Sequence, residues 1–185
     1  MSLGKARKSI SVRGGGTLLI RQLDPTPTNA YSDLGYIKDS TLEDADVMVG
    51  EVDESGVLPD FKSGSETCSW KLTLKQATQD EINFLRNAIN MYFEAYYKVT
   101  LGNGNIQEIS IPLCRVSPMF NAKFAANAER TLDIVITMLA PKAAFTRGVV
   151  AFNVVAGQPY ILVDNATAQF NTSNTEASTL AAAIL

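Results

Sequence analysis

Histidine is absent from this chain of 185 residues. Its absence removes the side chain that titrates nearest neutral pH, the most common transition-metal ligand, and the usual base beside a Ser or Cys nucleophile. Carboxylates do not replace it, because no Asp or Glu has the aromatic neighbours that would raise the pKa of a glycosidase acid. We therefore expect a protein that is not an enzyme and that holds no cofactor or catalytic metal.

Cysteine is scarce as well, and Cys68 and Cys114 are the only two. They are far apart in the sequence and lack the Cys-x-x-Cys spacing of zinc and redox sites. Free cysteine is often buried. We expect both thiols to be reduced and packed in the interior, in preference to the alternative of a disulfide.

An excess of one charge is also missing. The chain has 16 Lys and Arg against 19 Asp and Glu, a net charge of −3, and it has no basic stripe. Nothing therefore supplies the release of counterions on which affinity for nucleic acid depends. Tight binding of DNA is not expected.

Long apolar runs are absent too. No stretch approaches the roughly 20 apolar residues that cross a membrane, and the basic N-terminal region has no continuous apolar segment of a signal peptide. The sequence predicts a soluble protein without a cleaved export signal. The glycosylation patterns at Asn165 and Asn171 are then chance matches.

What is present is the composition of one globular domain, with 46% hydrophobic and 19% charged residues. We expect the domain to span residues 17–163. Before it, residues 1–16 read as a flexible basic arm that ends in a glycine hinge. After it, residues 164–185 read as a second arm, rich in Asn, Thr, Ser and Ala. The basic residues of the N-terminal arm are Lys5, Arg7, Lys8 and Arg13.

Alternating apolar and polar residues predict strands over 65–75, 93–101 and 130–139, and shorter strands at 17–23, 34–37, 149–155 and 160–163. Gly102-Asn103-Gly104-Asn105 has the composition of a tight hairpin turn, with a returning strand after it. The inward residues would be Cys68, Trp70, Leu72, Leu74, Phe93, Ala95, Tyr97, Val99, Leu101, Ile109, Ile111, Leu113, Leu132, Ile134, Ile136 and Met138.

One helix is predicted over 78–91. Thr78 and Glu81 match a capping box, and Ile82, Leu85 and Ile89 recur at helical spacing. It is the only strong helix signal. The expected fold is therefore mainly β, a β-sandwich or barrel with one flanking α-helix, a long hairpin insertion and extended terminal arms.

The insertion is the acidic, glycine-broken segment 39–63, which resembles a long hairpin or lid. Its acidic cluster does not fit a calcium loop, because Met48 and Val49 stand where an EF-hand needs Asp or Asn and then glycine. A solvated hairpin is the better interpretation. Its candidate contact residues are Glu43, Asp44, Asp46, Val47, Met48, Val49, Glu51, Val52, Asp53 and Glu54.

An aromatic run from Tyr92 to Tyr97, together with Trp70, is consistent with either a ligand-stacking surface or core packing. Packing is favoured, because the alternation places Phe93 and Tyr97 inward. Tyr96 is then the candidate exposed contact residue.

Two arms and an acidic hairpin have no obvious purpose in a monomer, but they make sense as contacts between copies. Three stretches also resemble the tail tube proteins of long-tailed bacteriophages, which are related in fold to the inner tubes of contractile secretion machines. The resemblance covers about residues 15–155. It is carried by Leu34-Gly35-Tyr36-Ile37-Lys38-Asp39-Ser40, by Val52-Asp53-Glu54-Ser55-Gly56, and by Trp70-Lys71-Leu72-Thr73-Leu74-Lys75-Gln76 running into the helix.

The resemblance implies a structural subunit of hexameric rings that stack into a tube, whose lumen conducts DNA during genome ejection without binding it specifically. Residues 39–63 would form the stacking hairpin, and the two termini would contact neighbouring subunits. The implied partners are copies of the chain itself and other tail proteins, such as a tape measure, sheath or terminator. The implied location is the tail of the virion, after assembly in the bacterial cytoplasm.

Other functions stay open at this point. The basic arm and the C-terminal extension also suit a tail terminator or a baseplate component that initiates the tube. A monomeric carbohydrate-binding or adhesin module would instead use Trp70, Tyr96 and Tyr97 as a stacking surface.

Overall fold

The computed structural model describes residues 9–11, 16–45, 48–49, 62–63, 67–75, 79–123, 131–146, 153–165, 167 and 176–185. Its strands are β1 (Ser9–Ser11), β2 (Thr17–Asp24), β3 (Ser32–Ala45), β4 (Met48–Val49), β5 (Lys62–Ser63), β6 (Thr67–Lys75), β7 (Tyr92–Thr100), β8 (Ile106–Lys123), β9 (Thr131–Met138) and β10 (Ile161–Asn165). Its helices are α1 (Gln79–Asn87), the short 3-10 helix η1 (Ala88–Asn90) and α2 (Ala177–Ile184).

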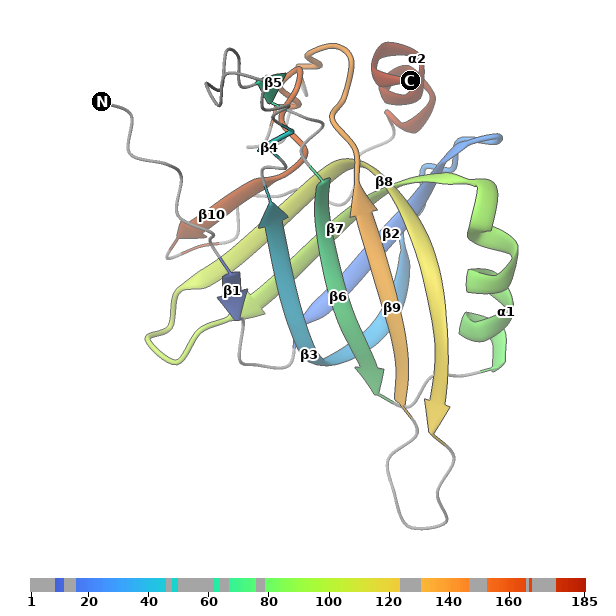
Figure 1. The fold of residues 1–185 in the computed structure, drawn as a ribbon, viewed down its shortest axis with the longest axis vertical. Helices are drawn as coiled ribbons and strands as arrows, with labels where there is room; N and C mark the ends of the chain where they lie inside the picture. The colour runs from blue at the N-terminus through green and yellow to red at the C-terminus, as the bar shows by residue number, and fades with distance from the viewer. Residues whose placement is uncertain are drawn as a thin grey trace, which may run out of the picture.

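Most of the strands form one antiparallel sheet that closes on itself. β3, β2, β7, β8, β9 and β6 follow one another in hydrogen-bonded order, and β6 pairs again with β3. Figure 1 shows β3, β6 and β9 side by side, with β2, β7 and the first part of β8 crossing behind them. The expected mainly β fold of the sandwich or barrel type is confirmed.

The long strands β3 and β8 connect the two layers. β3 pairs with β2 through residues 32–36 and with β6 through residues 37–45. β8 pairs with β7 through residues 106–114 and with β9 through residues 114–123. β1 lies on the edge of β3, and β10 lies on the edge of β8.

Side chains from every strand of the ring fill its interior. The rings of Trp70 and Tyr97 meet edge to face there, with their centroids 4.9 Å apart, and neither side chain is exposed. The alternation predicted for β6 and β9 is confirmed. Its buried residues are Cys68, Trp70, Leu72 and Leu74 on β6, and Leu132, Ile134, Ile136 and Met138 on β9.

The register of β8 corrects one predicted inward residue. Phe93 pairs with Cys114, whereas Ala95 pairs with Ile111, so β8 has one extra residue opposite β7. Such a bulge reverses the side chains that follow it. Cys114 therefore continues the inner face of Ile111, and Leu113 points instead into a second apolar cluster outside the ring.

The predicted helix is confirmed as α1 followed by η1. Leu85 and Ala88 are buried against the main core, and the ring of Phe84 meets that of Phe93 at a centroid distance of 5.8 Å. The predicted cap, Thr78, lies outside the described residues.

The end of the chain differs from the expected extended arm. Residues 161–165 form β10, and α2 packs against its own barrel with Ala177, Leu180 and Ile184 fully buried. The physical reason is that the apolar residues of 177–184 recur on one helix face, which covers Leu23 and Leu113. The expectation of a single helix is therefore wrong. In the described part of the chain, neither α-helix combines the length and the apolar character needed to cross a membrane.

The expected hairpin over residues 39–63 begins later than predicted. Residues 39–45 belong to β3 and pair with β6, so they are part of the main sheet. Beyond them, β4 pairs antiparallel with β5, with Met48 opposite Ser63. Several candidate residues lie outside the described residues: Lys5, Arg7, Lys8, Arg13, Asp46, Val47, Glu51, Val52, Asp53 and Glu54.

Candidate functional site

The two thiols are buried and not joined to each other, as predicted. Cys68 on β6 and Cys114 on β8 both pair with Met138 on the strand between them. Two strand spacings of about 4.8 Å place them beyond the roughly 7 Å that a disulfide allows. Cys114 donates to the carbonyl oxygen of Phe93 at 3.3 Å, and burial raises the pKa of its thiol. Neither thiol has the exposure of a reactive nucleophile.

No group of three or more His, Cys, Asp or Glu is placed to hold a metal ion within the ranges that the structure describes. Apart from Ser40 on β3, the buried polar residues of the described chain lie instead on the outer face of the layer formed by β2, β7 and β8. They are Arg21, Glu94, Glu108 and Ser110, together with Tyr96.

Arg21 on β2 and Glu94 on β7 form an ion pair on this face. The Nε of Arg21 lies 2.5 Å from Oε2 of Glu94, and neither side chain is exposed. The hydroxyl of Tyr31 donates to the same carboxylate at 3.1 Å, and the guanidinium stacks 4.7 Å from the Tyr31 ring centroid. Burial lowers the pKa of Arg21, while Tyr31 and Glu176 act in the opposite direction. Such a group holds strands and loops in register.

Tyr96 is the second polar anchor of this face, and it corrects a prediction. We expected Tyr96 to be an exposed contact residue, but only 3% of it is exposed. Its hydroxyl hydrogen-bonds to Oε1 of Glu108, and half-buried Leu19, Tyr31 and Ile161 pack around its ring. Burial raises the pKa of Tyr96, and the bond to Glu108 adds to that effect.

The candidate stacking surface for a carbohydrate is therefore not exposed. Trp70 and Tyr97 are 0% exposed inside the ring, and Tyr96 is buried on its outer side. The packing interpretation of the aromatic run is confirmed. Of the candidate hairpin residues, Glu43 is exposed and pairs with Lys71 at 3.0 Å, Asp44 lies in β3, and Met48 and Val49 form β4.

α2 covers the end of the same outer face. Its buried residues Ala177, Leu180, Ala181 and Ile184 contact an apolar surface that we call the helix groove. The groove is formed by Leu23, Leu113 and Val154, with half-buried Tyr92, Leu139 and Phe145.

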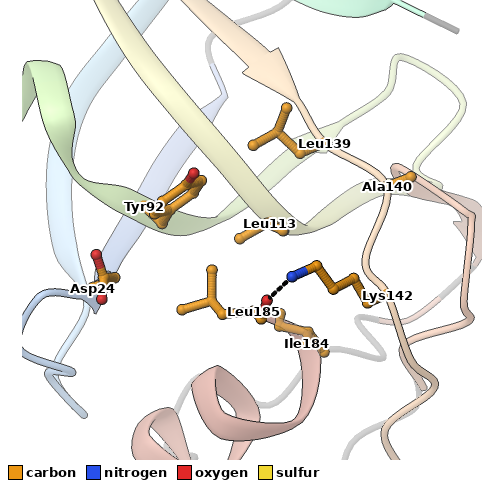
Figure 2. A pocket seen from close by; sticks show the side chains of 8 residues that line it. All are labelled: Asp24, Tyr92, Leu113, Leu139, Ala140, Lys142, Ile184 and Leu185. Carbon is orange, nitrogen blue, oxygen red and sulfur yellow. Dashed lines mark hydrogen bonds between the residues drawn. The ribbon is translucent and has the colours of Figure 1, made fainter. Parts of the chain in front are cut away.

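The helix does not fill this groove completely. A pocket of about 350 Å³ remains beside its last turn. Figure 2 shows Leu113 and Leu139 on the sheet side of this pocket and Ile184 and Leu185 on the helix side. The Nζ of Lys142 donates to the backbone oxygen of Leu185 at 2.5 Å across it. Asp24, Tyr92 and Ala140 complete the lining.

Two strands end the sheet on its outer sides. Within the described part of the chain, β1 pairs only with β3, and β10 pairs only with β8. Each therefore has one row of backbone groups that no described strand of this chain meets.

Sequence reasoning missed the outer-face polar residues and the helix groove. The signal for the first was the alternation itself, since Glu94 and Tyr96 lie between the inward residues of β7. The signal for the second was the spacing of Leu180 and Ile184. Comparison with known proteins adds no relative, because no family model and no curated protein matches the chain.

Proposed function

We propose that the protein is a structural, non-catalytic subunit that assembles with copies of itself into rings and stacks them into the tube of a bacteriophage tail. The observation that carries this proposal is the pair of sheet edges at β1 and β10, on opposite layers of a barrel whose own interior is filled. Unpaired strand edges bind further strands through backbone hydrogen bonds. An edge at each layer lets each copy join two neighbours, and heterologous contacts of this kind close into rings.

The packed interior bears on where a channel would lie. Trp70, Tyr97 and their neighbours fill the barrel, so the described part of a single subunit contains no passage through it. In the proposed tube the lumen is enclosed by several copies, and each contributes the outside of one layer. A net charge of −3 suits a wall along which DNA slides without adhering.

Stacking of the rings is assigned to the hairpin that begins with β4 and returns with β5. In the chain β4 follows the end of β3 and β5 precedes the start of β6, so we place the second ring at this end of the barrel. The proposed partners beyond the chain itself are the other tail proteins, namely a tape measure, a sheath or a terminator.

The proposal is tested by imaging the purified protein across a range of concentrations. We expect rings or tubes in negative stain, and a sizing column that reports multiples of the 20.0 kDa chain. A monomer that persists at high concentration contradicts the proposal.

A shortened variant separates ring formation from stacking. Residues 50–61, which connect β4 to β5, are replaced by a short turn. We expect single rings in place of tubes, with an unchanged circular dichroism spectrum. Tubes formed by this variant would remove the hairpin from the stacking contact.

A second candidate is a tail terminator or tube initiator. It is favoured by α2, because a helix docked on the outer face covers a surface that a repeating tube subunit could use to contact the next copy. Single closed rings without stacks, formed by the unaltered chain, would support this candidate over the tube subunit.

A further inference from the structure

α2 is attached to the barrel as a separable unit. Its apolar face belongs to the helix groove cluster, and none of the residues of that cluster is part of the main core inside the ring. The main core is therefore complete without α2. An element whose contacts are confined to a satellite cluster opens at lower cost than the core strands.

The helix also depends on the groove for its own structure. It has eight residues, and no side chain of its own caps its first turn. Isolated helices of this length are not stable in water. α2 therefore forms where an apolar groove receives Ala177, Leu180 and Ile184.

The polar contacts at both ends of α2 come from the barrel. Asn29 supplies the missing cap, because its Oδ1 accepts from the backbone N–H of Ala177 at 3.2 Å. At the other end, the Nζ of Lys142 donates to the backbone oxygen of Leu185 at 2.5 Å. The backbone N–H of Lys142 donates to the backbone oxygen of Ile184 at 3.4 Å. The groove thus recognises this helix by both of its ends and by its face.

The tether allows the same helix to reach another copy. Residues 166–176 separate the end of β10 from α2. A chain of this length spans at most about 36–40 Å when it is extended, which is comparable to the width of a small domain. Exchange of one identical element between copies replaces each lost contact by an identical one, so it carries little energetic cost.

We propose that the helix groove is an interface between copies, and that on assembly α2 of one copy docks in the groove of the next. The occupant is a second copy of this chain, because the groove already fits this helix face and both of its ends. The proposal rests on the self-assembly proposed above, and it names the contact by which one copy holds its neighbour.

A cysteine pair distinguishes exchange from docking within one chain. Asn29→Cys and Ala177→Cys place thiols at two positions that a hydrogen bond already joins. The assembled double variant is oxidised and separated on a denaturing gel without reductant. We expect a ladder of linked chains, and the single variants N29C and A177C serve as controls that give no ladder. Assembled rings that contain only internally linked single chains overturn the exchange and leave the proposed function standing. Absence of any assembly overturns both.

Complementation provides a second measurement that does not depend on disulfide formation. Leu180→Asp disables the helix, and Leu139→Asp disables the groove, whereas neither residue belongs to the main core. Each variant alone should stay monomeric, and its circular dichroism spectrum should keep the strand signal of the parent and lose only the small contribution of α2. If helices are exchanged, a mixture of the two forms mixed dimers, because one intact helix meets one intact groove. Docking within each chain predicts no rescue, and a mixture that stays monomeric overturns the proposal.

Discussion

Arg21 and Glu94 face each other across β2 and β7, with Nε 2.5 Å from Oε2 and neither side chain exposed. Removal of one partner from a buried pair leaves the other charge without compensation, although the intact pair itself adds little net stability. Removal of one partner should therefore lower the free energy of unfolding by much more than the intact pair adds to it.

Glu94→Gln tests this expectation. We expect a loss of about 3–5 kcal/mol in the free energy of unfolding, measured by urea denaturation. The exposed pair Lys71 and Glu43 is the matched control, and Glu43→Gln should cost no more than about 1 kcal/mol. The double variant Arg21→Met with Glu94→Leu should be more stable than the single Glu94→Gln. Equal losses at the buried and exposed pairs would contradict the argument.

Gly16 is required by a close approach. A Cβ at this position would overlap the ring of Tyr97. Gly16→Ala should therefore destabilise the fold by about 1–3 kcal/mol through overpacking. In a double-mutant cycle with Tyr97→Leu, most of that loss should disappear, because the smaller side chain leaves room for the methyl group. Additive losses would show that the strain has another source.

Tyr97 should make the fold sensitive to alkaline pH. Burial raises its pKa to about 12, compared with about 10 in the unfolded chain. Between these two values only the unfolded state loses the proton, so stability that is fully present below pH 10 is lost as the pH rises toward 12. The loss should be about 2–3 kcal/mol.

Tyr97→Phe is the matched variant for that pH dependence. The Tyr97 hydroxyl is buried and has no hydrogen-bond partner among the described residues. Its removal should therefore leave stability at pH 7 unchanged or raise it by about 1 kcal/mol. Above pH 10 the stability of the variant should fall less steeply than that of the parent. Parallel curves from pH 7 to pH 12 would contradict the assignment.

Gly104 fixes the turn between β7 and β8. Its φ of 88° lies in the left-handed region, and its N–H donates to the carbonyl oxygen of Leu101 at 2.9 Å. Gly104→Ala should cost about 1 kcal/mol in thermal or urea unfolding. Gly102→Ala is the control, because it lies in the same turn, in open space and without a positive φ. A larger loss at Gly102 than at Gly104 would contradict the argument.

Short sequence patterns predicted the strands, the turn and the helix whose structure depends on neighbouring residues in the sequence. The alternation of β6 and β9, the turn at Gly102 to Asn105, and α1 were all recognisable, because each is specified within about a dozen residues. The register of β8 was not. Pro112 lies at the bulge, and a proline alone does not tell which residue of a long strand is extra.

The candidate site was less predictable, because it depends on what covers the second face of a layer. Alternation along β7 places Tyr96 and Tyr97 on opposite faces of the strand. It does not predict that other side chains also cover the outer face, on which Tyr96 lies. α2 was missed because Ala and Ser are common in tails as well as in helices. The spacing of Leu180 and Ile184 indicates a helix only once the apolar groove that buries both side chains is known.

The closed order of the strands also sets when folding can finish. β9 pairs with β6 on one side and with β8 on the other, and it is the last strand of the ring in the sequence. A chain emerging from the ribosome therefore holds two open edges and an incomplete core until Met138 has left the exit tunnel. Pairing of such distant segments is slow, and the exposed edges invite association between nascent chains. Emergence of the last strand from the tunnel is thus the step that closes the ring of strands and completes its core, and among the described strands only the edges at β1 and β10 then stay open to other chains.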